Sequence, residues 1–287
     1  DRVVQVGNQR RSWPNVIEAV AAIRAGEIGR VRYAKSWYVN NRPSIGIGRE
    51  VPVPGWLDWD LWQGPAPRVK AFRDNVVHYN WHWFWHWGTG EALNNGTHFV
   101  DILRWGLGYP TLVTSVGGRY RFQDDWETPD TQLITYQFGD EASCSWEGRS
   151  CNGTPVDGFG VGTAFYGETG TLFISGGNEY RIADMGGKTV KEVQSALKFE
   201  EGNLLNPSEQ LDVIHFRNWF DAIRKGEKLN SGIVDACIST QLVQLGNIAQ
   251  RVGRSLRIDP TTGRILDDRE AGDLWGRTYE KGWEIRV

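Results

Sequence analysis

The chain has 287 residues, of which 40% are hydrophobic and 23% are charged, a composition typical of a globular protein. Its formal net charge of -3 and its lack of a basic run exclude an electrostatic nucleic-acid surface. No stretch approaches the ~20 consecutive apolar residues of a membrane span, so we expect neither nucleic acid nor membrane as a partner. Cys144, Cys151 and Cys237 give no disulfide framework and no metal spacing. A 144–151 bridge and free thiols both fit, and the compartment stays open.

The first part of the chain predicts a strand, a helix and a second strand before a long irregular segment. Val3–Val6 is a short β run, and Pro14 opens a helix that Gly26 closes in the C′ position. Alternating apolar residues in Arg30–Val39 predict a strand with one buried face. Residues 40–90 are rich in Gly, Pro and Trp and have no clear period. A segment of that length without regular structure inside a compact domain is usually functional.

The second part predicts a helix, a meander of strands and two terminal helices. The helix runs from about Glu91 to Leu107, before Gly108 and Pro110. The expected strands are Leu112–Tyr120, Gln132–Phe138, Ala142–Glu147, Gly162–Tyr166, Thr171–Ser175 and Tyr180–Ala183. Helices are expected at Pro207–Lys225 and Val234–Val252. Consecutive strands with short turns favour antiparallel pairing. The fold class is therefore α+β, a large, mostly antiparallel open sheet covered on one face by helices.

Tryptophan is concentrated in one part of the irregular segment. The chain has 15 Trp, and seven of them, at positions 56, 59, 62, 81, 83, 85 and 87, lie within 32 residues. One interpretation is a rigid loop region held by aromatic packing. The other is a platform for a flat apolar ligand face such as a sugar ring, with indole N–H groups left to donate.

Histidines recur inside this tract at a regular spacing. His78, His82 and His86 stand at i, i+4 and i+8, and Glu91 is the only carboxylate near them in sequence. A metal stripe is one interpretation, but zinc usually takes thiolates or carboxylates beside such histidines. We favour polar groups that reach sugar hydroxyls between stacked indoles, and no metal. The candidate substrate-binding residues are His78, Tyr79, Trp81, His82, Trp83, Trp85 and His86.

The helix expected from Glu91 carries the candidate catalytic residues. Asn94, His98, Asp101 and Trp105 stand at i, i+4, i+7 and i+11, so on a regular helix they share one side. An imidazole titrates near neutrality and suits reversible alcohol oxidation as a general acid or base. The alternative for His98 is a histidine hydrogen-bonded in the core. Asn94 cannot take a proton and can only orient a partner. Asp101 either holds the His98 ring or pairs structurally with Arg104.

Several segments together resemble the Gfo/Idh/MocA oxidoreductases, the glucose–fructose oxidoreductase and inositol dehydrogenase superfamily. Residues 4–11 resemble the strand that closes the family's Rossmann domain, and residues 25–31 resemble the passage from helix to strand after it. Residues 94–105 resemble the family's active-site helix. Residues 57–67 and 245–254 resemble a subgroup common among polysaccharide-degrading and often exported bacterial members.

This resemblance implies a domain organisation and a cofactor. In the family, a G-x-G-x-x-G turn and a Glu-Lys-Pro motif with a catalytic Lys precede this point, and neither is in the 287 residues. We therefore expect residues 1–12 to be the remnant of a dinucleotide-binding domain, with its last strand, and residues 13–287 to be the substrate-binding and oligomerisation domain. NAD or NADP is the implied cofactor, bound mostly by a preceding domain. The candidate cofactor contacts are Asn8, Gln9, Arg11 and Trp62, with turn and helix capping as the alternative for the first three.

Three functions follow from these observations. The first is the substrate domain of an NAD(P)-dependent oxidoreductase acting on a sugar, glycoside or cyclitol, with His98 as general acid or base. The resemblance implies a carboxylate four residues before this histidine in many relatives, where this chain has Asn94. The second is a glycoside hydrolase or lyase that uses NAD for transient oxidation and elimination. The third is a non-catalytic carbohydrate-binding or scaffold domain. The resemblance also implies a homodimer or homotetramer formed through the open sheet.

Overall fold

A computed structural model describes residues 2–196 and 209–284, and an open mixed sheet forms the centre of these residues. Its nine described strands have the order β8-β7-β6-β5-β1-β4-β3-β2-β9. Their bounds are β1 Val31–Val39, β2 Leu112–Gly118, β3 Thr131–Phe138, β4 Ala142–Arg149, β5 Val161–Gly167, β6 Gly170–Ser175, β7 Tyr180–Asp184, β8 Thr189–Val193 and β9 Leu256–Arg257. Only β1 and β4 pair in parallel among the described strands. The predicted α+β fold with a mostly antiparallel open sheet is confirmed.

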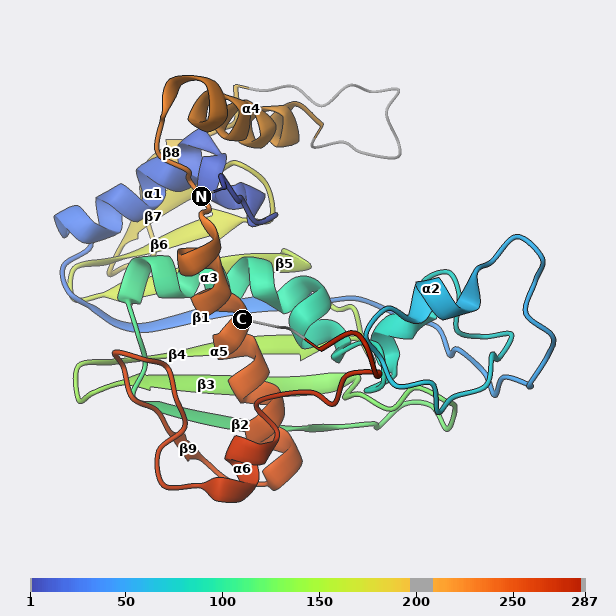
Figure 1. The fold of residues 1–287 in the computed structure, drawn as a ribbon. Coiled ribbons are helices and arrows are strands. Elements are labelled where there is room, and N and C mark those ends of the chain that lie inside the picture. The colour runs from blue at the N-terminus through green and yellow to red at the C-terminus, as the bar shows by residue number, and fades with distance from the viewer. Residues whose placement is uncertain (1, 197–208, 285–287) are drawn as a thin grey trace.

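Helices cover one face of this sheet. Figure 1 shows α1, α3 and α5 lying across the same face, with α4 beyond α1 at the β8 end. The helices are α1 Pro14–Ala25, α2 Trp59–Gln63, α3 Thr97–Leu107, α4 Glu209–Lys225, α5 Ile233–Val252 and α6 Arg269–Asp273. Two short 3₁₀ turns, η1 Gln9–Ser12 and η2 Asn80–Trp83, and a π turn, η3 Ala92–Gly96, complete the helical elements. The irregular segment that carries α2 projects to one side of the sheet (Figure 1).

Local sequence signals account for most of these boundaries. Pro14 occupies the first turn of α1, and Gly26 ends it at φ 79°, a left-handed conformation that favours glycine. The start expected at Pro207 lies outside the described residues, and the described helix α4 begins at Glu209. The three cysteines are free thiols in the structure.

Strand β1 lies at the centre of the sheet and is buried on both faces, which differs from the expected single buried face. Ala34 belongs to the main core beneath the helices. On the opposite face, Trp37 packs with Phe173 in a smaller apolar cluster, where their rings are 5.9 Å apart. Successive side chains of a strand point to opposite faces of the sheet. A strand that lies between two cores therefore needs apolar residues at both odd and even positions.

The strand expected at Val3–Val6 is wrong. Within the described residues this segment makes one isolated bridge, between Gln5 and Gly232, because no strand runs beside it. The sequence reading also missed β8 and β9. Strand β8 is a polar edge strand, with the sequence Thr-Val-Lys-Glu-Val, and β9 has only two residues. Short or polar edge strands give little periodic signal.

Candidate functional site

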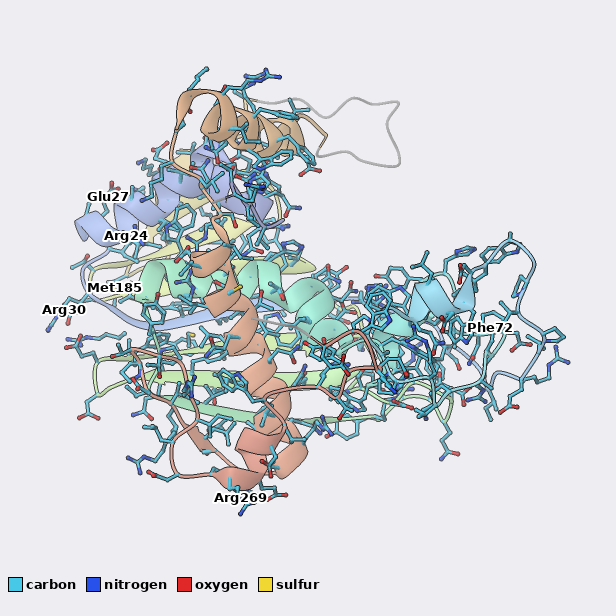
Figure 2. All side chains as sticks on the ribbon, in the orientation of Figure 1. Arg24, Glu27, Arg30, Phe72, Met185 and Arg269 are labelled. Atoms are coloured by element: carbon cyan, nitrogen blue, oxygen red, sulfur yellow. The ribbon has the colours of Figure 1, made fainter. Side chains whose placement is uncertain are left out.

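A cavity of about 1380 Å³ lies between the Trp-rich segment, one side of α5 and residues 274–279. It brings together six of the sequence-predicted site residues, which are Trp62, Trp81, His82, Trp85, His86 and Asn94. Figure 2 shows side chains crowding the part of the molecule around Phe72, where the irregular segment projects. Phe72 packs edge-on against Trp59, at a ring separation of 5.1 Å.

The aromatic wall of the cavity contains indoles that pack on one another and indoles that leave ring surface exposed. Trp59 and Trp62 stack at 4.8 Å, and Trp87 packs edge-on against both rings. Trp81 stacks on His82 with ring centroids 3.8 Å apart, and both line the cavity. Packing between the indoles therefore fixes the wall, while Trp62 and Trp81 leave aromatic surface at the cavity.

A row of polar side chains on α5 forms the opposite wall, and the sequence analysis missed it. The row consists of Thr240, Gln241, Gln244, Asn247 and Arg251. Their spacing places them on one side of the helix, and this was the available signal. A polar stripe of this kind is typical of a solvent-facing side. Here residues 274–279 and the Trp-rich segment enclose it instead.

Hydrogen bonds fix the orientation of Asn94 at the cavity. Its Nδ2 donates to the Tyr79 hydroxyl at 2.9 Å and to Glu91 Oε1 at 3.2 Å. An ionised carboxylate only accepts hydrogen bonds, so Nδ2 must be the atom that faces Glu91. The carbonyl Oδ1 is then left as the acceptor for a ligand hydroxyl. Glu91 is itself buried and accepts from Arg42 Nε at 2.9 Å, which anchors the carboxylate.

His98 lies outside the residues that line the cavity and has different neighbours. Neither ring nitrogen has a hydrogen-bond partner among the described residues, and Nδ1 is enclosed. Burial lowers the His98 pKa from 6.5 to about 4, and the positive charge of Arg10 adds to this effect. The imidazole is therefore neutral at pH 7 and able to accept a proton.

Asp101 belongs to a buried ion-pair network. It accepts two hydrogen bonds of 2.7 Å from Arg11, while Arg104 donates to Ser239 at 2.7 Å. Ser239 in turn donates to Asp101. No hydrogen bond joins Asp101 to His98 within the described chain, so the geometry supports the structural alternative for this carboxylate.

The prediction that four residues share one side of a helix is wrong. These residues are Asn94, His98, Asp101 and Trp105. The Arg11 guanidinium lies 4.6 Å from the Trp105 ring and also pairs with Asp101. Asn94 instead reaches Tyr79 and the cavity. The cause is the π turn Ala92–Gly96, in which bonds run from i to i+5 and the angular step per residue is smaller than in an α-helix.

Other candidate residues also occupy separate places. His78 stacks on Trp56 at 5.2 Å and does not line the cavity. Trp83 is buried against Trp126, with rings 4.0 Å apart, and is part of the core. The Tyr79 hydroxyl accepts a hydrogen bond from Asn94 Nδ2 at 2.9 Å and so helps to orient Asn94. His86 Nε2 lies 2.9 Å from the carbonyl of Pro67. Among the described residues, no group of three or more His, Cys, Asp or Glu is placed to hold a metal ion.

The four candidate cofactor contacts are not brought together. Arg11 is fully engaged by Asp101 and Asp235. Trp62 lies in α2, which Figure 1 shows well apart from the chain near the N-terminus. Asn8 and Gln9 remain, each with a buried polar atom, Nδ2 and Oε1, that has no partner in the described part of the chain.

No helix of the described residues is long and apolar enough to cross a membrane.

Comparison with known families identifies the fold. A model of the GFO/IDH/MocA C-terminal domain matches residues 16–173, which is more than half of the chain. The chain belongs to the Gfo/Idh/MocA family. A second model, of the oxidoreductase family C-terminal alpha/beta domain, matches residues 174–285. A search of curated protein sequences gave no match.

Solved structures of several oxidoreductases share the fold at low sequence identity. An aldose-aldose oxidoreductase from Caulobacter crescentus, complexed with glycerol, has a TM-score of 0.61 at 16% identity, over 90% of this chain and 64% of that one. A levoglucosan dehydrogenase in complex with NADH and levoglucosan gives 0.58 at 17%, over 87% and 64%. The WlbA dehydrogenase from Bordetella pertussis, with NADH and UDP-GlcNAcA, gives 0.58 at 15%, over 90% and 63%. The chain thus spans about 64% of the length of such relatives.

The orientation of Asn94 leads to a prediction for Asn94→Asp. The new carboxylate faces Glu91, so repulsion raises its pKa and the Nδ2 donor is lost. We expect the free energy of unfolding to fall by about 1–3 kcal/mol at pH 8, with a smaller loss at pH 5, where the new group is protonated and donates again. Urea denaturation at the two pH values measures this difference.

A matched control is Asn152→Asp. The Asn152 Oδ1 accepts from Arg149 at 3.0 Å and from the Thr154 amide at 2.8 Å, so a carboxylate preserves both bonds. We expect this variant to be at least as stable as the wild type. Equal stability losses in the two variants would contradict the assigned orientation of Asn94.

Proposed function

We propose that this chain is the substrate-binding part of an NAD(P)-dependent oxidoreductase that acts on a sugar, glycoside or cyclitol. The observation that carries the proposal is the pairing of two features, one in the π turn η3 and one in the first turn of α3. Asn94 presents an acceptor oxygen to an aromatic-lined cavity, and His98 is a neutral imidazole with no hydrogen-bond partner in the described chain. The names of the solved relatives, which include a levoglucosan dehydrogenase and an aldose-aldose oxidoreductase, support a sugar substrate for this family fold.

In the proposed mechanism, this chain holds the sugar and moves one proton. The exposed faces of Trp62 and Trp81 contact the apolar face of a sugar ring. Asn94 Oδ1 accepts a hydrogen bond from a sugar hydroxyl and sets the orientation of the ring. His98 does not line the cavity, so the proposal requires the reacting hydroxyl to extend from the cavity past Asn94 to the imidazole. The imidazole is neutral above about pH 4, and it accepts the hydroxyl proton during oxidation and returns it during reduction.

The described residues include two groups that suit contact with a nicotinamide. The unpaired buried atoms Asn8 Nδ2 and Gln9 Oε1 supply one donor and one acceptor, and the neighbouring Arg10 acts on the pKa of His98. When bound, the cofactor accepts or donates the hydride. Arg11 and Trp62 do not suit this role, because one is held in an ion-pair network and the other lies in α2. In this proposal residues 1–12 lead from a dinucleotide-binding domain, and residues 13–287 form the substrate domain.

The size of the cavity favours a second candidate function. At about 1380 Å³ it exceeds the ~300–1,000 Å³ of a typical small-molecule site, so it accommodates more than one sugar ring. This supports an NAD-assisted hydrolase or lyase, in which transient oxidation at one carbon acidifies its neighbour. The neighbouring carbon then loses a proton, and the glycosidic bond breaks by elimination as the leaving alcohol takes up a proton. In a hydrolase water adds to the resulting double bond, whereas a lyase keeps it. Return of the hydride, with one proton, to the ketone restores the hydroxyl, so no cofactor is consumed.

A stoichiometric assay separates these functions. Full-length protein is incubated with NAD or NADP and a panel of free sugars and glycosides, while NADH or NADPH absorbance and sugar release are both followed. Reduced cofactor formed in step with the oxidised sugar is the expected result. Sugar release without net cofactor reduction would support the hydrolase or lyase. Tight sugar binding with neither reaction would reject both and leave a carbohydrate-binding domain.

A further inference from the structure

The cavity is lined by more positive than negative charge, although the whole chain has a net charge of -3. Lys70, Arg251 and Arg277 line it, and Glu127 is the one carboxylate among the lining residues. Burial lowers the pKa values of His82 and His86 below 6.5, so these two histidines are neutral at pH 7. The cavity therefore differs in charge from the rest of the molecule.

These three cations lack acidic partners within the part of the chain that the structure describes. Among the described residues, no Asp or Glu forms a salt bridge with Lys70, Arg251 or Arg277. By contrast, Arg254, three residues beyond Arg251, pairs with Asp268 at 2.8 Å. Glu127, whose Oε2 accepts the backbone amide of Trp85 at 2.8 Å, offsets one of the three positive charges, so the lining keeps an excess of positive charge.

The two arginines are held close to the aromatic wall. The Arg251 guanidinium lies 5.2 Å from the centre of the Trp85 ring. Arg277 donates to the carbonyls of Trp85 at 3.0 Å and Gly88 at 3.1 Å. The positive charge of Arg251 also contributes, after desolvation, to a lowered pKa of Arg277, so the two cations act on each other. Two like charges held near each other at a cavity favour an anion between or beside them.

The position of Arg251 follows from the polar row on α5. It stands two turns beyond Gln244, so an amide and a guanidinium follow one another along the same wall. Asn247, between them, is buried and bonded to Thr89 and Gln132, so it supports this wall from within the protein. Amides bind hydroxyl groups, aromatic rings contact sugar faces, and a guanidinium binds carboxylate or sulfate oxygens. A neutral sugar uses the first two of these groups and leaves the third unpaired.

We propose that the cavity binds a carbohydrate carrying an anionic substituent, a carboxylate or a sulfate ester, which Arg251 holds together with Lys70 and Arg277. This rests on the proposed function for the sugar itself and adds the charge of the substrate. The neutral, aromatic part of the wall holds the ring, and the cationic part selects the substituent.

Calorimetric titration of full-length protein without cofactor tests the proposal. The probes are trigalacturonic acid and its methyl ester, and a sulfated carrageenan tetrasaccharide and its desulfated form. We expect at least one acidic probe to bind about tenfold more tightly than its neutral counterpart at low salt, and the difference to shrink at 0.5 M NaCl. The probe pair that shows the difference identifies carboxylate or sulfate.

Arg251→Gln is the test variant and Arg269→Gln its control for the same loss of charge. Arg269 belongs to α6, which lies at the lower edge of the molecule in Figure 2, and it is not among the residues that line the cavity. We expect Arg251→Gln to remove most of the preference for the acidic probe, without weakening the neutral one, and Arg269→Gln to keep that preference.

The outcomes separate this inference from the proposed function. Equal binding of acidic and neutral probes, or equal effects of the two variants, would overturn the anionic substituent and leave a sugar substrate standing. Failure of both neutral and acidic probes to bind, together with an inactive sugar panel, would reject the proposed function as well. Retained preference in Arg251→Gln would assign the anion to a different group and overturn the role of Arg251.

Discussion

His98→Asn is expected to lower kcat/KM for sugar oxidation by about 10²- to 10⁴-fold, the usual contribution of a general acid or base. Asparagine is polar and close in size to part of the imidazole, so the fold is expected to persist, as circular dichroism would verify. A rate within threefold of the wild type would remove His98 from the mechanism.

The same substitution has a pH-dependent effect on stability. His98 has a folded-state pKa of about 4 and an unfolded value of 6.5, so between these values the unfolded chain binds the extra proton. Stability from this group is therefore present above pH 6.5 and is lost as the pH falls toward 4. The loss is about 3 kcal/mol at full protonation. We expect the wild type to lose more free energy of unfolding than His98→Asn over this window. Parallel curves in chemical denaturation would contradict the lowered pKa.

Asp101→Ala is expected to lower the free energy of unfolding by about 3–5 kcal/mol, because Arg11 loses its buried carboxylate partner and keeps only the half-exposed Asp235. Arg11 and Asp101 are 6% and 1% exposed, so water does not replace the lost interaction. Urea denaturation measures the loss. The control is Glu168→Gln, which weakens the exposed pairs with Arg30 and Arg32 and is expected to change the free energy of unfolding far less than Asp101→Ala does.

A second variant distinguishes a structural role for Asp101 from an effect through His98. Asp101→Asn keeps the shape of the side chain but removes its charge. If Asp101 is structural, the apparent pKa in the rate profile stays close to that of the wild type, although stability falls. A clear downward shift of that pKa, with stability unchanged, would show that Asp101 acts on the imidazole, and the structural assignment would then be wrong.

Elements with strong local signals were predictable. The cap residues Pro14 and Gly26 determine where α1 begins and ends, and alternating apolar residues determine most of the strands. The isolated bridge at Gln5 and the short strands β8 and β9 were not predictable in this way. Whether an extended segment becomes a strand depends on a neighbour that supplies hydrogen bonds, and no local pattern records that neighbour.

The candidate site also has features with a local sequence signal and features that depend on distant contacts. The sequence alone determined that aromatic residues and histidines gather in one tract, and that Asn94 and His98 belong to one helical segment. It could not predict the π turn between them. There Gly96 lies so close to Trp146 that an added Cβ would be 2.8 Å from the indole, a contact made across 50 residues of chain.

The cavity itself was decided only by the tertiary structure. The polar stripe that ends in Arg251 has the spacing of a solvent-facing side of a helix, and it becomes a wall only because residues 274–279 and the Trp-rich segment pack around it. Composition and periodicity report which side of an element avoids water. They do not report which polar side meets another polar surface, because that depends on contacts between distant parts of the chain. The sequence thus determined the fold class and the chemical groups, and the packing of distant segments decided which of those groups share a site.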